Sequence, residues 1–315
     1  MATLYYNQVG IIDRYGVGKH ALDKEIDKLR VRYNKNPLQG SQFVRQENAT
    51  GGVYTEATFG TSLELPRQNE DSERVPMATP IPGYKATGTV VNYRLGLQVE
   101  KSYVEDDLKG VVRKQCSGLL NSGRMLVEYQ IAAYMNNLTS SSYPGADALA
   151  LVSASHPFER REQGTWSNLE TGAALSLTTF STARKNMRKR TNEFGYPNPL
   201  TVRLLQVGAD GEQKARELKT AEKNPENALN QPNVWRNDNW DYFVYDFQTS
   251  TTAWNLFADV PEEFKGIVYV NRVQPNIAPL EGRDMSTDIV WGQRLRIRSV
   301  VVGVTGYFLQ HNEGA

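Results

Sequence analysis

Three arginines near the C-terminal end of the chain are spaced so that they could bind anions together. Arg294, Arg296 and Arg298 alternate with Leu295 and Ile297, and alternation of period two places every second side chain on one face of a β-strand. Guanidinium groups bind carboxylates or phosphates through charge-assisted hydrogen bonds. The row favours a solvated face or an ion-pair network within an assembly. The alternative is weak contact with a polyanion that does not depend on sequence.

A second basic group lies on the segment 178–191, whose apolar residues recur at helical spacing. We expect Phe180, Ala183 and Met187 to point inward from this helix. The basic residues are Arg184, Lys185, Arg188, Lys189 and Arg190. The same two interpretations apply to them.

A wholly polar segment, 67–74, separates two strand-like limbs. The limb before it alternates apolar and polar residues over 53–65, and the limb after it, 75–82, carries three prolines. The pattern predicts a long hairpin with nothing at its tip that could form a core. We therefore expect the tip to pack against another subunit. The predicted contact residues are Arg67, Glu70, Asp71, Glu73 and Arg74.

Residues that could support catalysis or bind a metal are few and scattered. The histidines at positions 20, 156 and 311 lack metal-ligand spacing, and Cys116, the only cysteine, is expected in the core. Ser155 precedes His156, but neighbouring residues on an extended chain point to opposite sides, so this serine cannot easily use His156 as its base. The sequence predicts no catalytic, cofactor or metal site, and no enzyme.

Aromatic residues are dense over 235–254, where two aspartates, Asp241 and Asp246, lie among them. Aromatic rings on a surface can stack on bases or sugars. The aspartates would repel phosphates, however, and the pattern favours an aromatic-rich strand in the core of a domain.

These groups need a scaffold, and its strongest element is a long amphipathic helix over 103–138. The helix opens on three acidic residues, 105–107, which suit the positive end of a helix dipole. Its apolar stripe recurs every three or four residues. The stripe consists of Leu108, Val112, Cys116, Leu119, Gly123, Val127, Ile131, Tyr134 and Leu138.

Shorter elements surround this helix. Turn-forming residues over 139–145 mark the best boundary in the chain. Apolar and polar residues alternate over 91–99, so the odd residues from Val91 to Val99 are expected to share one face of a strand. We predict further strands over 201–207, 242–247, 266–273 and 295–308, and further helices over 21–32 and 211–223.

The chain has 315 residues, enough for two domains or for one domain with a large insertion. Its 36 basic and 35 acidic residues leave a net charge of +1, which argues against tight recognition of DNA. Balanced charge instead suits a surface that meets copies of itself. There is no run of eighteen apolar residues and no signal peptide, so no membrane partner is expected.

The order of the elements resembles that of the major capsid proteins of tailed double-stranded DNA bacteriophages, in particular the Mu-like major head subunits. Residues 95–107 are similar to the strand that enters the long helix in that family, and 148–157 to its apolar segment ending in Ser-x-x-His-Pro. Residues 167–169 with 175–176 are similar to the Asn-Leu and Leu-Ser pairs that follow. Residues 253–257 resemble its late aromatic strand.

The resemblance implies an α+β fold of the Hong Kong 97 type, with a long spine helix, peripheral and axial domains, an extended hairpin loop and an N-terminal arm. The implied segments are an arm (1–50), the hairpin loop (51–88), a first peripheral part (89–147) containing the spine helix (103–138), an axial domain (148–265) and a second peripheral part (266–315).

The resemblance also implies a structural role. Subunits would assemble as pentamers and hexamers into an icosahedral head around double-stranded DNA, located in the virion after assembly in the host bacterial cytoplasm. Implied partners are further copies of the chain, a separate scaffolding protein, a portal, a decoration protein, and DNA through weak non-specific contact. Two alternatives remain: an encapsulin-like nanocompartment subunit, and a soluble enzyme or carbohydrate-binding protein that uses residues 235–254.

Overall fold

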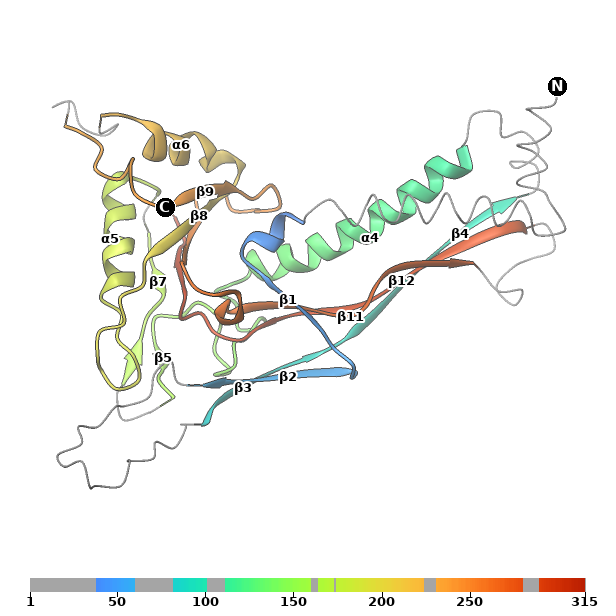
Figure 1. Cartoon of the computed structure of the whole chain (residues 1–315), viewed down its shortest axis with the longest axis horizontal. Helices are drawn as coiled ribbons and strands as arrows, with labels where there is room; N and C mark the ends of the chain where they lie inside the picture. Colours follow the sequence, from blue (N-terminus) through green and yellow to red (C-terminus); the bar gives the residue numbers. More distant parts are fainter. Residues whose placement is uncertain are drawn as a thin grey trace, which may run out of the picture.

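The computed structural model describes residues 38–59, 82–100, 111–159, 164–172, 174–223, 231–279 and 289–314. The two largest sheets in this part of the chain have four and five strands (Figure 1). A four-stranded sheet accompanies one long helix, and a five-stranded sheet accompanies two shorter helices, so the fold belongs to the predicted α+β class. The predicted helix 21–32 and the charged tip 67–74 lie outside the described residues. None of the helices in the described part is long and apolar enough to span a membrane.

The four-stranded sheet has the order β1-β11-β12-β4. Its members are β1 (Arg45–Asn48), β11 (Ile267–Pro279), β12 (Ile289–Gly303) and β4 (Val91–Glu100). β1 runs parallel to β11, and the other neighbours are antiparallel. Strand β1 comes from the segment predicted as an arm, so the end of that segment is part of the sheet.

Helix α4 (Val111–Met135) lies along one face of this sheet (Figure 1). Its stripe is buried as predicted from Cys116 onward, and Gly123 lets the helix approach the sheet closely. A β-carbon at Gly123 would stand 2.9 Å from a methyl group of Leu295. Positions 103–110 of the predicted helix lie outside the described residues. At the other end, the helix stops at Met135 rather than Leu138, because the Asn136 side chain donates to Phe247 O and holds the chain in a turn.

A hairpin crosses the opposite face of the same sheet. Strands β2 (Val53–Phe59) and β3 (Pro82–Thr89) pair antiparallel, which confirms the base of the predicted hairpin. Ala86 on β3 packs against Val302 within a small buried cluster. Gly88 is required there, because a β-carbon would stand 2.3 Å from a methyl group of Val302.

The residues of β4 that were predicted to share one face do so in the sheet register, but two of them are not buried. Val91 and Leu95 are 45% and 51% exposed. Leu95 pairs with Leu295 and so points toward the α4 side. Because β4 is an edge strand and α4 packs mainly over β12, Val91 and Leu95 are exposed within the described part of the chain, whereas Tyr93 and Leu97 are partly buried.

The five-stranded sheet has the order β7-β13-β10-β8-β9. Its members are β7 (Leu169–Glu170), β13 (Leu309–Asn312), β10 (Trp254–Ala258), β8 (Val202–Val207) and β9 (Asp241–Val244). The predicted strand 201–207 is confirmed, whereas the strand predicted over 242–247 ends early. After Val244 the chain turns, with Gln248 N donating to Tyr245 O. Two short strands, β5 (His156–Pro157) and β6 (Thr165–Trp166), pair separately.

Two predicted helices of this region are confirmed with shifted ends. Helix α5 (Leu177–Arg188) is capped at its N-terminus by Ser176, whose side chain forms a capping box with Thr179. Its inward residues Phe180, Ala183 and Met187 are buried as predicted. Helix α6 is Glu212–Thr220, and the 3-10 helices are η1 (Gln39–Gln42), η3 (Ala209–Gly211) and η4 (Glu262–Phe264).

The end of the chain corrects one prediction. Residues 295–308 were expected to form one strand. Strand β12 instead ends at Gly303, where the amides of Val304 and Thr305 donate to Gly266 O and turn the chain. Strand β13 then pairs with β10 and β7 in the other sheet. A shared core of α4, β11 and β13 residues, including Ile131, Tyr269 and Leu309, connects the two sheets.

Candidate functional site

The three predicted arginines lie together on one face of β12. Leu295 and Ile297 point toward α4 and are buried, while Arg294, Arg296 and Arg298 lie on the opposite face and are half-buried. This face continues beyond the part that the hairpin covers at Val302, so the arginines extend past the edge of the hairpin. The predicted alternation is therefore confirmed. The position of the three arginines does not decide between an ion-pair network and contact with a polyanion.

Two further arginines join this row from neighbouring strands. Arg94 on β4 pairs directly with Arg296, which places both side chains on the same face. Arg272 lies at a register shift between β11 and β12, next to Arg298. We call this set the arginine face. It consists of Arg94, Arg272, Arg294, Arg296 and Arg298.

The arginine face has an excess of positive charge. Burial, together with the charges of Arg272, Arg296 and Arg94, lowers the pKa of Arg298. The Nε atoms of Arg296 and Arg298 are buried and have no hydrogen-bond partner within the described part of the chain. Among the carboxylates that the structure describes, none forms an ion pair with this face. The arrangement is thus equipped to bind an anionic group from outside the subunit.

The basic residues of α5 and of the two positions that follow it divide into two kinds. Arg184 pairs with Asp238 and lies 4.5 Å over the Trp235 ring, and Arg190 is buried. Arg190 donates to Tyr307 O, to Ser167 O at 3.1 Å and to Gln310 Oε1 at 2.6 Å. Burial lowers the pKa of Arg190 to about 10, so its guanidinium remains charged at neutral pH. The remaining residues of this basic group, Lys185, Arg188 and Lys189, are exposed.

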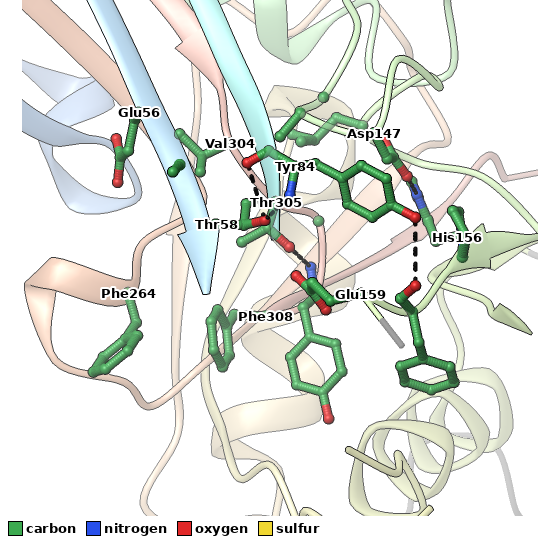
Figure 2. Close-up of a pocket in the computed structure, with 18 of the residues that line it drawn as sticks. Glu56, Thr58, Tyr84, Asp147, His156, Glu159, Phe264, Val304, Thr305 and Phe308 are labelled. Carbon is green, nitrogen blue, oxygen red and sulfur yellow. Dashed lines mark hydrogen bonds and ion pairs between the residues drawn. The ribbon is translucent and has the colours of Figure 1, made fainter. Parts of the chain in front are cut away.

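An acidic cleft, which the sequence did not predict, lies beside the base of the hairpin (Figure 2). Its volume is about 200 Å³. Burial raises the pKa of Glu159, and the carboxylates of Glu193 and Asp147 raise it further. Tyr84 from the hairpin donates its hydroxyl to Phe158 O at 3.4 Å (Figure 2). The cleft therefore joins the hairpin base to the loops around the second sheet.

His156 lines this cleft and is held by its neighbours. Its Nδ1 atom is 2.6 Å from Asp147 Oδ2, and its ring stacks on Trp166 with centroids 4.4 Å apart. The imidazole is 3% exposed, and its Nε2 atom has no hydrogen-bond partner in the described residues. Ser155 N, by contrast, donates to Ser153 Oγ. Asp147 and Trp166 therefore fix the position of the His156 imidazole in the cleft.

The aromatic residues over 235–254 belong largely to the core, as favoured by the sequence. Trp240, Tyr245 and Trp254 are buried, and Trp240 packs against Phe180 with ring centroids 4.8 Å apart. Buried rings cannot stack on a base or a sugar. Cys116 is also buried as predicted, and burial raises the pKa of its thiol to about 12. Within the described residues, no cluster of three or more metal-ligating side chains is present.

Several solved structures with a similar fold are subunits of protein shells. The procapsid protein of bacteriophage JBD30 is 14% identical, with a TM-score of 0.50 over 93% of this chain and 73% of that one. The capsid protein of a native GTA particle is 10% identical, with a TM-score of 0.52 over 89% and 91%. The SrpI encapsulin of Synechococcus elongatus PCC 7942 is 10% identical, with a TM-score of 0.51 over 88% and 87%. These similarities define the class: an α+β protein with the Hong Kong 97-type fold, as predicted.

Comparison of the sequence with protein families identifies the family of this chain. Residues 89–308 match the family model described as phage capsid protein, and the chain belongs to the phage capsid protein family. Family and fold together identify a structural major capsid protein of a phage head. No curated protein matches the sequence.

Proposed function

We propose that copies of this chain assemble as pentamers and hexamers into an icosahedral head that encloses double-stranded DNA. The observation that carries this proposal is the family match over 89–308, because those residues contain α4 and most of both sheets. Similarity to a procapsid and to a capsid is consistent with the same mode of assembly.

The two sheets suggest a revised domain assignment. The four-stranded sheet and α4 form the peripheral domain, with α4 as its spine helix. The five-stranded sheet with α5 and α6 forms the axial domain, and β13 (Leu309–Asn312) is assigned to it because it pairs with β10 (Trp254–Ala258). The arm is 1–44 in this assignment, because β1 belongs to the peripheral sheet.

The extended hairpin (51–88) is proposed to contact an adjacent subunit through the charged tip at 67–74. Individual exposed ion pairs contribute only about 0–1 kcal/mol. A closed shell repeats each contact many times, so their sum can favour assembly. The tip residues proposed for this contact are Arg67, Glu70, Asp71, Glu73 and Arg74.

Assembly in the cytoplasm of a host bacterium would require further proteins. A separate scaffolding protein, a portal and a decoration protein are proposed as partners by analogy with phage heads. Packaged DNA is proposed to make weak, non-specific contacts. The near-zero net charge supports close approach of many subunits, because strong self-repulsion would oppose closure.

Electron microscopy of the purified full-length chain, alone and with its proposed scaffolding protein, tests the proposal. Uniform closed shells with pentamers and hexamers are expected. A monodisperse monomer under all conditions would refute self-assembly and favour a soluble enzyme or binding protein.

An encapsulin-like compartment is a second candidate, because the similarity to SrpI is as high as that to the phage capsids. Both candidates predict closed shells, so the molecules found inside the shells distinguish a phage head from an encapsulin-like compartment. Shells from infected cells should contain DNA and a portal. Shells that contain a protein cargo and lack both would favour the compartment.

A further inference from the structure

We propose that the arginine face contacts the phosphate backbone of double-stranded DNA. This inference rests on the proposed function, which supplies the enclosed DNA, and it assigns that contact to a particular surface. Arg94, Arg272, Arg294, Arg296 and Arg298 carry it.

The spacing of the arginines suits a regular polyanion. Antiparallel strands rise about 3.4 Å per residue, so alternate residues on β12 are about 7 Å apart and Arg294 to Arg298 spans about 14 Å. One strand of B-DNA presents about four phosphates over that length. Arg94 and Arg272 lie on the two neighbouring strands. They widen the surface to about 10 Å, because strands in a sheet lie about 4.8 Å apart.

The buried Nε atoms of Arg296 and Arg298 are a second observation that points to a missing anion. Arginine has five N–H donors, and a buried donor without an acceptor costs free energy. In the described part of the chain no acceptor satisfies these two atoms. Phosphate oxygens can accept from these groups when the arginine side chains rotate outward, and the phosphate charge also reduces the repulsion between adjacent guanidiniums.

The composition of the face favours DNA over a second copy of this chain. On β4 the residues that share the side of Arg94 are Asn92, Gly96 and Gln98, which have no apolar side chain. On β11, Val273 and Ala278 pair with Arg298 and Arg294, so the apolar side chains of this face are confined to its β11 side and are partly buried. Protein interfaces carry an apolar centre, whereas DNA interfaces are more polar and far more positive. The exposed apolar residues of β4, Val91 and Leu95, lie on the other side of the sheet.

Salt-dependent binding of the full-length chain to a fluorescent 30-base-pair duplex tests the assignment. The test variant combines Arg294→Gln, Arg296→Gln and Arg298→Gln. The matched control, on α5, combines Lys185→Gln, Arg188→Gln and Lys189→Gln, which removes three exposed charges elsewhere. A third variant carries lysine at the three β12 positions and keeps their charge. Circular dichroism and thermal melting confirm that each variant is folded.

We expect the slope of log K against log salt to become shallower by about 3 in the test variant, equally for two unrelated DNA sequences. The control should change the slope by less than about 1, and the lysine variant should retain most of it. The single substitution Arg296→Gln, with an expected change of about 1, replaces the triple variant if the latter does not fold.

Three results would overturn the assignment. One is an unchanged slope in the test variant, and another is an equal loss in the α5 control. The third is loss of shell assembly with DNA binding intact, which would identify the face as an ion-pair surface between copies. Failure of the parent chain to form shells would refute the proposed function without affecting the slope comparison.

Discussion

Arginines in the two sheets of this molecule have opposite environments. Arg190, beside the five-stranded sheet, is buried and donates to three oxygens from two separate segments. Arg296, in the four-stranded sheet, lies among other guanidiniums and has a buried Nε atom without a partner. The first arginine is used by the fold itself. The second is left for something outside the subunit, and this difference separates charge that stabilises the fold from charge that can bind an external anion.

The most severe test of this comparison introduces a buried charge with no partner. Glu128 and Val127 are neighbours on α4 and both are buried, but Glu128 accepts from the amides of Gln39 and Gly40. Val127→Asp should cost about 4 kcal/mol or more and abolish soluble protein, because the core offers the new carboxylate no donor. Soluble expression and chemical denaturation measure this. Ser122→Asp, at an exposed position of α4, should remain soluble.

Arg190→Met is expected to have the next largest effect. It leaves the carbonyl oxygens of Ser167 and Tyr307 and the amide oxygen of Gln310 without their donor. We expect a loss of about 3–5 kcal/mol in the free energy of unfolding, measured with urea. Arg188→Met, at the exposed last residue of α5, should change it by less than about 0.5 kcal/mol. Equal losses would remove the distinction between paired and unpaired arginines.

Glu128 provides a smaller, pH-dependent test of a satisfied buried charge. Burial raises its pKa, although the amides of Gly40 and Gln39 and the charge of Arg124 oppose that effect. A raised folded pKa means that the group favours folding at low pH and loses this contribution as pH rises through the folded value. Glu128→Gln should therefore gain stability relative to the parent between pH 4 and pH 7. A constant difference across that range would contradict the raised pKa.

Much of the scaffold could be predicted from the sequence, because it follows from local periodicity. The stripe from Cys116 onward and the alternation at 294–298 were identified, since each repeats over many residues. The switch of β13 into the other sheet was missed, because the turn after Gly303 depends on amides that donate to Gly266 O, far away in sequence. Periodicity predicted that Val91 and Leu95 share one face of a strand, but it could not predict that both are exposed at the edge of the sheet.

The candidate site was predicted only where it lies on one strand. Arg294, Arg296 and Arg298 were found by their spacing, but Arg94 joins them through strand register and Arg272 through a register shift. The acidic cleft was missed for a similar reason. His156 and Asp147 are nine residues apart in an irregular segment, where no spacing rule brings an imidazole and a carboxylate together.

Arg296→Gln should barely change stability, and its effect should depend on salt. Removing one of several adjacent guanidiniums relieves repulsion, so we expect a change between zero and a gain of about 0.5 kcal/mol at low salt. Salt screens the same repulsion in the parent, so the difference should vanish near 0.5 M NaCl. Denaturation at two salt concentrations measures this. A loss above about 1 kcal/mol would show that Arg296, like Arg190, is used by the fold.

The smallest effect on unfolding is expected at the charged tip. Arg67→Glu combined with Arg74→Glu should leave the free energy of unfolding unchanged, because the tip sequence offers no apolar residue to a core. Assembly should fall nonetheless, since each reversal turns a proposed attraction between subunits into repulsion at every copy of the contact. Light scattering follows assembly, with Arg188→Glu as a control reversal on α5. If both reversals assemble like the parent, the charges of the tip do not contribute to subunit contact. If the tip variant instead unfolds as readily as Val127→Asp, its charges belong with Arg190 among those that hold the subunit together.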